Sequence, residues 1–331
     1  MMQNPLSTAA AARPEHLALV TADGQLTYAE LAEAARRRAG QFVAAGVCAG
    51  QRVGLVGSPS AQWVIDFHGL LYAGAVVALA ERLELLLSIY AKGERPSGSS
   101  DPYALRRAGN GVLQILWGMG WRLDLMAFLS HAVAEWAALF PAFSVDASQL
   151  HKDLCQLMRQ RIVSQLEDDG FAPDLVQAVA GDALSNERLL SDPLDVKQRI
   201  QLLRDLRNSG QLDAVQAVVQ RAAKLAEKGD LARDQLVPGD VVRPERFESA
   251  SEQDLFSALV QLQPLAQQRS YQALADALVA ATPALQAFFD GDTSVMVMVD
   301  DSALRLNRLN LLAVLRNQAS VLAEFESIQS K

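Results

Sequence analysis

The hydrophobic positions near the start of the chain form short runs separated by turn residues. Residues 17–20 and 25–27 flank Asp23-Gly24, a dipeptide that favours tight turns. Apolar and β-favouring runs on both sides of such a dipeptide are typical of two paired strands. The pattern therefore predicts a β-hairpin.

A helix is predicted directly after this hairpin. Thr27 and Glu30 have the three-residue spacing of a capping box, and Gly46 is placed to end the helix. Residues 52–56 then predict a buried strand, and residues 60–73 a second helix. The inward face of that second helix is expected to carry Trp63, Phe67, Leu70 and Leu71.

The spacing changes near residue 78, where apolar positions begin to recur three and four residues apart. One such helix is predicted by Leu212, Val215, Val219, Ala222 and Leu225. The last helix carries the stripe Leu304, Leu311, Leu315, Leu322 and Phe325, and Asp301 is placed to cap its start. Loops are expected at residues 93–100, 140–148, 181–193, 229–244 and 291–294.

Residues 295–299 and residues 101–102 allow two more specific predictions. Residues 295–299 form a short apolar run that fits either a strand or a buried extended loop, and Met296 and Met298 are expected to pack in the core. Asp101 is placed to cap another helix, with Pro102 at its favoured first position.

The fold class follows from this change of pattern. The first 78 residues predict a small α/β fragment and the remainder an all-helical region, so the chain is expected to be mainly α. No Pro/Gly linker marks the boundary, and a helix running from Gly74 through Glu81 is compatible with the sequence.

Composition narrows the class of protein. The 331 residues are 50% hydrophobic and 6% aromatic, with a formal net charge of −8. This acidic balance argues against a dedicated DNA-duplex binder, because phosphate neutralisation requires basic side chains. No long uncharged span and no leader are visible, so a cytoplasmic protein without a membrane segment is expected. Cys48 and Cys155 are far apart and are expected to be free thiols.

Catalytic and metal-binding patterns are not evident in the sequence. His16, His68, His131 and His151 are scattered without the spacing of a zinc site. Neither a phosphate-binding glycine loop nor a nucleophile elbow is present. We therefore expect no complete active site, no metal and no cofactor in this chain.

The N-terminal fragment resembles the opening of the acyl-adenylate-forming enzymes. The resemblance is carried by residues 14–20, 26–31, 46–53 and 72–77, including the strings "LTYAEL" and "GVCAGQRV". The ATP-binding loop, the adenosine-binding acid and the hinge lysine of that family lie beyond the matching stretch. The resemblance therefore implies a scaffold fragment without adenylation activity.

The rest of the chain, from about residue 79, resembles the C-terminal part of the bacterial glycyl-tRNA synthetase beta subunit. Its motifs are residues 77–83, 96–108, 174–179, 192–196, 288–290, 295–301 and 304–309. The resemblance implies the end of an HD-like helical region at residues 79–150 and a helical anticodon-binding domain at residues 151–331. Glu81 and Glu84 stand where that family commonly has Asp, so no HD-type metal site is expected.

The resemblance also implies a function and its partners. The chain is expected to bind glycine tRNA for a separate catalytic alpha subunit, and ATP is used by the holoenzyme. Arg305, Asn307 and Arg308 at the start of the last helix, with Arg106 and Arg107, are the candidate tRNA contacts, because Arg holds phosphate or stacks on an unpaired base and Asn reads a base edge.

Alternative interpretations stay open for these residues and for the chain. Arg305 has Asp301 four residues earlier as a possible ion-pair partner. Arg106 and Arg107 fit a packing or capping role, and the cluster of Lys152, Arg159 and Arg161 fits a solvated helix face. For the whole chain the rivals are an orphan helical fusion module without tRNA function and, with less support, an acyl-adenylating ligase.

Overall fold

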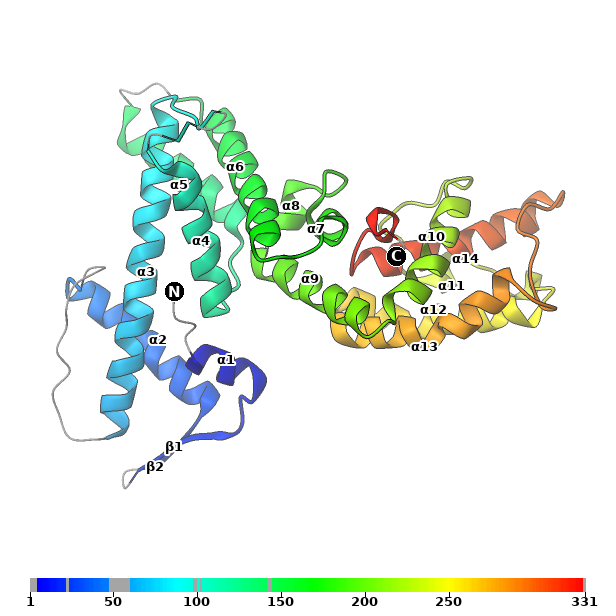
Figure 1. Ribbon diagram of the computed structural model, residues 1–331, viewed down its shortest axis with the longest axis horizontal. Coiled ribbons are helices and arrows are strands. Elements are labelled where there is room, and N and C mark those ends of the chain that lie inside the picture. Colours follow the sequence, from blue (N-terminus) through cyan, green and yellow to red (C-terminus); the bar gives the residue numbers. More distant parts are fainter. Residues whose placement is uncertain are drawn as a thin grey trace. The chain divides into compact units, whose positions relative to one another are not determined.

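The structure is a computed structural model that describes residues 5–21, 24–47, 60–97, 100–101, 103–141 and 145–329. The chain forms two compact units. Unit 1 comprises Met1–Gln165 and Ser185–Asp195, and unit 2 comprises Leu166–Leu184 and Val196–Lys331. In the described ranges the only sheet has two strands and the remaining elements are helices, so the prediction of a mainly α fold is confirmed (Figure 1).

Unit 1 begins with α1 (Pro5–Ala12) and the predicted hairpin. Strands β1 (Leu17–Thr21) and β2 (Gly24–Thr27) pair antiparallel, with Leu19 opposite Leu26. The capping box is confirmed too: Glu30 N donates to Thr27 Oγ1 over 3.3 Å, and Thr27 N donates to Glu30 Oε2 over 2.8 Å. This box starts α2 (Tyr28–Ala44). Asp23 and the strand predicted at residues 52–56 lie outside the described residues.

The next helix is longer than predicted. α3 (Ala61–Ala91) runs without a break through the predicted boundary at residue 78 and packs along α2 (Figure 1). Tyr72 and Ala73 of α3 share one core with Ala35 of α2 and with Ile115 of α4 (Leu105–Met119). The two sequence regions are therefore joined both by a helix and by a common core. The domain limits at residues 78 and 150 stay predictions.

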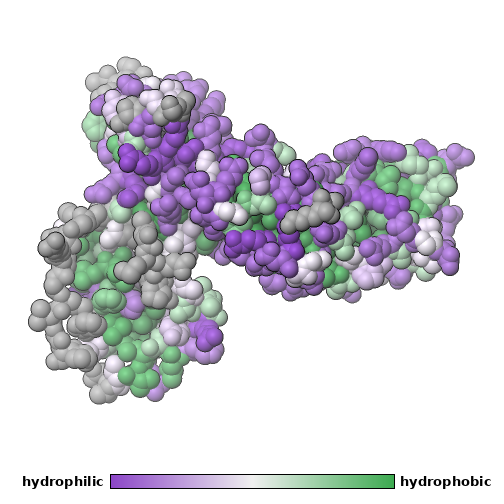
Figure 2. Space-filling view, in the orientation of Figure 1, coloured by the Kyte–Doolittle hydropathy of each residue, from purple (hydrophilic) through white to green (hydrophobic). Residues whose placement is uncertain are grey.

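The inward face of α3 differs from the prediction. Phe67 and Leu71 are 44% and 38% exposed, whereas Val64, Ile65 and Tyr72 face the core. This part of unit 1 shows a hydrophobic area in the space-filling view (Figure 2). The prediction was wrong for Phe67 and Leu71, because a helix that is apolar around most of its circumference does not reveal its buried side by periodicity. Leu70 is half-buried, and the side chain of Trp63 lies outside the described part of the structure.

Glycines on α4 allow long side chains to cross it. A Cβ at Gly109 would lie 2.8 Å from Arg161 Cγ, and a Cβ at Gly111 would overlap the Arg82 guanidinium. Neither position has room for a larger residue unless these arginines move. The rest of unit 1 comprises α5 (Leu125–Leu139), α8 (Asn186–Leu190) and most of α6 (Ala147–Asp168).

Unit 2 is a helical bundle around its last long helix, α14 (Ser302–Ser320). This helix packs against α10 (Leu212–Ala226) and α12 (Ala250–Gln267). The predicted stripe is confirmed, since its members are between 0 and 8% exposed, although the helix ends at Ser320 and the last two stripe residues lie beyond it. The remaining elements are α7 (Pro173–Ala180), α9 (Pro193–Asn208), α11 (Pro238–Val241), η2 (Pro244–Arg246), α13 (Tyr271–Phe289) and η3 (Phe325–Ser327).

Candidate functional site

The five candidate contacts occupy the first turns of two helices. Arg305, Asn307 and Arg308 lie at the start of α14 in unit 2, and Arg106 and Arg107 lie at the start of α4 in unit 1. The two groups are described separately, because they belong to different units.

The N-terminus of α14 is capped as predicted. Asp301 Oδ1 accepts hydrogen bonds from Ala303 N over 2.8 Å and from Leu304 N over 3.0 Å. These two bonds lower the pKa of Asp301, and the nearby charges of Arg246 and Arg305 add to the effect. Asp301 therefore stays ionised where the helix dipole favours a negative charge.

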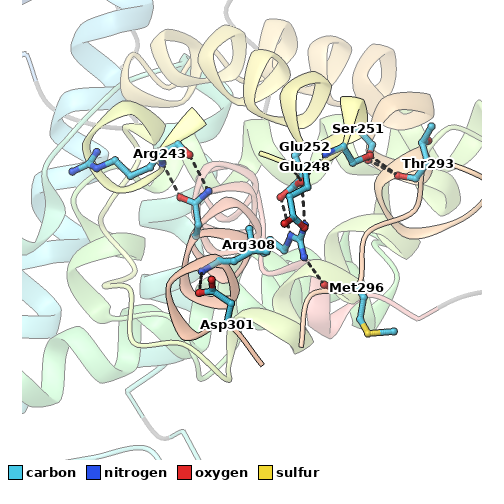
Figure 3. A network of polar contacts seen from close by, with 11 residues as sticks. Arg243, Glu248, Ser251, Glu252, Thr293, Met296, Asp301 and Arg308 are labelled. Carbon is cyan, nitrogen blue, oxygen red and sulfur yellow. Dashed lines mark hydrogen bonds and ion pairs between the residues drawn. The ribbon is translucent and has the colours of Figure 1, made fainter. Parts of the chain in front are cut away.

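Arg308 is inside the bundle rather than on its surface. It is 4% exposed. Its Nε donates to Glu252 Oε1 over 2.9 Å, one Nη2–H donates to Glu248 Oε2 over 2.9 Å, and Nη1 donates to Met296 O over 3.0 Å (Figure 3). Burial alone would lower the pKa of Arg308, but its bonds to both glutamates outweigh this effect and raise the pKa. With the further bond from Nη2 to Glu252 Oε2 over 3.3 Å, each of its three guanidinium nitrogens donates to another group of the protein.

Glu252 has a second role at the start of α12. Its Oε2 accepts hydrogen bonds from Glu248 N over 2.8 Å and from Ser249 N over 3.0 Å, which completes a capping box with Ser249. Burial would raise the pKa of Glu252, but the Arg308 bond and these backbone donors lower it overall. One carboxylate thus caps α12 and holds α14 against it.

Asn307 is also turned inward. It is 4% exposed; its Oδ1 accepts from Arg243 N over 2.7 Å and its Nδ2 donates to Arg243 O over 3.1 Å. The amide edge that was predicted to read an RNA base is occupied by a backbone of the same chain. Contact of Asn307 and Arg308 with tRNA stays a prediction, and this conformation favours a structural role for both.

A signal for this burial is present in the sequence. Leu304, Arg308, Leu311 and Leu315 follow each other at spacings of four, three and four, so Arg308 lies on the apolar stripe of its own helix. A charged residue on a buried face requires a charged partner, and the partner here is 56 residues earlier in the sequence.

Arg305 is half-buried and its guanidinium reaches the preceding loop. Its Nη1 donates to Val299 O over 2.7 Å. This hydrogen bond is found in place of the ion pair with Asp301 that the sequence suggested. Arg305 and Arg308 together hold the carbonyls of Val299 and Met296. They therefore fix the course of this loop.

The two methionines of the loop are not packed as predicted. Met296 and Met298 are 73% and 45% exposed, whereas Val297 between them is 6% exposed. Residues 295–299 form no strand but a loop that bends at residues 297–298, where Val299 N donates to Val297 O over 3.1 Å. The prediction of core packing was wrong because the two arginines orient the backbone so that alternate side chains point outward.

The start of α4 confirms the predicted role of Asp101. Its Oδ1 accepts from Leu105 N over 2.7 Å and its Oδ2 accepts from Arg106 N over 3.0 Å. The helix begins at Leu105, three residues later than predicted, and Pro102 lies outside the described residues. Arg106 is half-buried, with Nη1 3.4 Å from Ser100 O, and Arg107 is exposed.

The third basic cluster is only partly a solvated face. Arg159 is 9% exposed and donates from Nη1 to Asn186 Oδ1 over 3.2 Å, whereas Lys152 is exposed. His151 and Cys155 are four residues apart on α6, a spacing that the sequence contains, and Cys155 Sγ lies 3.4 Å from His151 Nε2. Burial raises the pKa of the Cys155 thiol to about 11, so it is protonated at neutral pH.

The described residues contain neither a cluster of metal-binding side chains nor a helix suited to spanning a membrane. Among those residues no three His, Cys, Asp or Glu side chains gather in a way that could hold a metal ion. None of the helices described combines the length and apolar character that crossing a bilayer requires. Cys155 is a free thiol, and Cys48 lies outside the described residues.

Two family models match the chain. Residues 71–181 match the model described as glycyl-tRNA synthetase beta subunit, and residues 6–82 match the model described as AMP-binding enzyme. The two matches overlap at residues 71–82, which lie inside α3. The N-terminal resemblance and the larger one are therefore both found by comparison.

Curated relatives share most of the chain. The chain is 45% identical over 262 residues to the glycine–tRNA ligase beta subunit of Picosynechococcus sp., a match that covers 77% of this chain and 36% of that protein. The proteins of the same name from Acaryochloris marina and Pseudomonas putida are 43% and 34% identical over 77% and 73% of this chain, and 36% and 33% of their own lengths. The chain thus spans about a third of the length of the curated relatives it matches.

Proposed function

We propose that this chain binds glycine tRNA for a separate catalytic subunit, because 77% of it is similar to a glycine–tRNA ligase beta subunit and residues 71–181 match the family model of that subunit. In this proposal the alpha subunit performs aminoacylation and the holoenzyme uses ATP. The single observation that carries it is the identity of 45% over 262 residues to a glycine–tRNA ligase beta subunit.

The geometry reduces the set of residues that we propose to contact RNA directly. Arg107 is exposed, and Arg106 and Arg305 are half-buried at helix starts. Guanidinium groups in such positions suit phosphate oxygens or unpaired bases. Asn307 and Arg308 serve the proposal indirectly, since their internal bonds set the position of α14 and of the loop before it.

Direct binding tests this proposal. The full 331-residue chain is titrated with glycine tRNA and with a glycine tRNA whose anticodon has been exchanged, at several salt concentrations. Tighter binding of the native anticodon, weakening with salt, is the expected result. Equally weak binding of both tRNAs would defeat the proposal.

Arg305→Gln tests whether unit 2 contacts tRNA. We expect it to weaken glycine tRNA binding by about three- to tenfold, as expected for one lost phosphate or stacking contact. Val299 and Arg305 are both only half-buried, so we expect folding to be retained. The matched control is Arg233→Gln, an exposed arginine of the same unit.

A second candidate function rests on the N-terminal match. Residues 6–82 match the model described as AMP-binding enzyme, a different family from that matched by residues 71–181. This suits a fusion module that keeps the helical fold without tRNA binding. That module would fold cooperatively and show no preference among tRNAs in the titration above.

A further inference from the structure

The methionines of the described residues differ widely in their exposure to solvent. Met296 is 73% exposed, the highest value of any large hydrophobic side chain that the structure describes, and Met298 is 45% exposed. Met126 is half-buried, whereas Met119 and Met158 are 7% and 0% exposed. The two methionines of the loop before α14 therefore present their side chains to solvent, and the other three do so less or not at all.

The Met296 side chain points away from the ion pairs that surround its backbone. Arg308 Nη1 donates to the Met296 carbonyl over 3.0 Å, and Figure 3 shows the side chain directed away from Arg308, Glu248 and Glu252. The sulfur is therefore turned to solvent, while the backbone of the same residue is held by the protein.

The backbone of this loop is anchored by groups other than the two methionine side chains. Val295 N donates to Phe288 O over 2.9 Å, and Arg305 Nη1 donates to Val299 O over 2.7 Å. Between these bonds the Val297 side chain is 6% exposed. A chemical change at either sulfur therefore removes none of the contacts that set the course of the loop.

Exposed thioether sulfur is open to oxidation by peroxides. A sulfur lone pair attacks one peroxide oxygen, the O–O bond breaks and an S=O bond forms. The sulfur loses two electrons, and the proton of the transferred OH passes to the departing hydroxide, so that hydrogen peroxide yields water. The product, methionine sulfoxide, is polar where the thioether was apolar, and methionine sulfoxide reductases return it to methionine.

Cys155 is a poor competitor for such an oxidant. Its side chain is buried, and burial raises the pKa of its thiol to about 11. Oxidation of cysteine requires the thiolate, which this pKa makes scarce at neutral pH.

We propose that Met296 and Met298 form a reversible oxidation site for hydrogen peroxide and alkyl hydroperoxides, and that their sulfoxides make the surface before α14 polar without unfolding it. Leu306 in α14 is 47% exposed, so oxidation removes two of the three exposed large hydrophobic side chains between residues 296 and 306. The inference concerns the chemistry of this loop and does not depend on tRNA binding.

The first test exposes the full chain to dilute hydrogen peroxide at neutral pH and follows each methionine by mass spectrometry of proteolytic peptides. Met296 should be oxidised fastest, Met298 within about threefold of it, and Met119 and Met158 at least about tenfold more slowly, because oxidation follows exposure. Oxidation of Met158 as rapid as that of Met296 would overturn the inference, since it would show that burial does not select the site.

The second test measures whether the modification affects the fold. The control is the double variant Met296→Leu with Met298→Leu, which keeps both positions apolar but lacks the sulfurs. After equal peroxide treatment, the midpoints of thermal unfolding of the wild type and the variant should differ by less than about 2 °C. A larger drop in the wild type alone would refute the claim that the sulfoxides leave the fold intact.

The third test concerns reversal. The oxidised, folded chain is treated with methionine sulfoxide reductases of both types, one for each sulfoxide epimer. Met296 and Met298 should return to their original mass, because their side chains are exposed to the enzymes. Oxygen that persists on the folded chain but is removed from its proteolytic peptides would contradict the proposed reversibility.

Discussion

Arg308 Nε donates to Glu252 Oε1 over 2.9 Å in an ion pair whose side chains are only 5% and 0% exposed. The pair joins residues 56 positions apart, and the same carboxylate caps α12. Two charges in such a place stabilise the fold only together, because either one alone would be buried without compensation.

Glu252→Gln should therefore destabilise unit 2 strongly. It leaves the Arg308 charge without its main partner, and we expect the free energy of unfolding to fall by about 3–5 kcal/mol. Urea unfolding followed by circular dichroism measures this. The control is Glu33→Gln, which removes an exposed pair with Arg37 and should cost under about 1 kcal/mol. Equal effects of the two substitutions would contradict the assigned role of Glu252.

Acid sensitivity should arise in part at Asp174. The two hydrogen bonds from Arg207, at 3.0 and 2.6 Å, lower the pKa of Asp174 to about 2, with a further bond from Gln329 N. Because the folded-state pKa is below the unfolded value, the carboxylate stabilises the fold above about pH 4, and this contribution disappears as the pH falls through about 2.

Asp174→Asn tests this dependence. The variant should lose about 2 kcal/mol of stability at pH 6 and show a smaller further loss between pH 4 and 2 than the wild type. Free energies of unfolding at pH 2, 3, 4 and 6 give the comparison. Asp290→Asn, which removes an exposed partner of Arg221, should follow the wild-type curve. Parallel curves for Asp174→Asn and wild type would refute the proposal that this carboxylate contributes.

Two neighbouring residues of the loop before α14, Met296 and Val297, differ strongly in exposure and can be compared by the same substitution. Met296 is 73% exposed and Val297 is 6% exposed. Met296→Ser should change the free energy of unfolding by less than about 0.5 kcal/mol, because Arg308 binds the backbone carbonyl and not the side chain. Val297→Ser should cost about 1–3 kcal/mol through loss of a buried apolar group. The reverse order would show that the methionine is packed.

Asn307→Ala should act on stability rather than on RNA affinity. It removes both partners of the Arg243 backbone, and leaving such groups unpaired costs about 2–3 kcal/mol. Asn310→Ala, which loses one bond to Val241 O, should cost about 1 kcal/mol. Thermal and urea unfolding measure both. A stable Asn307→Ala variant with weakened tRNA binding would instead support direct contact with RNA.

The sequence predicted those features that depend on neighbours in the chain. Thr27 with Glu30, Asp101 and Asp301 were all identified as helix caps, because a cap and the amides it binds lie within five residues of each other. The hairpin and the apolar stripe of α14 were predicted for the same reason, since periodicity is local.

Features that depend on distant partners were not predicted. The inward positions of Asn307 and Arg308 are fixed by residues 64 and 56 positions earlier in the chain. The outward positions of Met296 and Met298 follow from bonds that the backbone makes with arginines of the next helix. A pocket in unit 1 is lined by Tyr90 of α3, Arg106 of α4 and Asp153 of α6, so no single stretch of sequence contains it.

The unbroken course of α3 ties the packing at its two ends to each other. Since each residue of an α-helix turns the chain by about 100°, the number of residues between Tyr72 and Leu86 fixes the angle between the side buried at one end and the side buried at the other. Gain or loss of one residue in this stretch would rotate all later side chains away from their buried positions. Only changes of length that preserve helical phase would keep both ends covered.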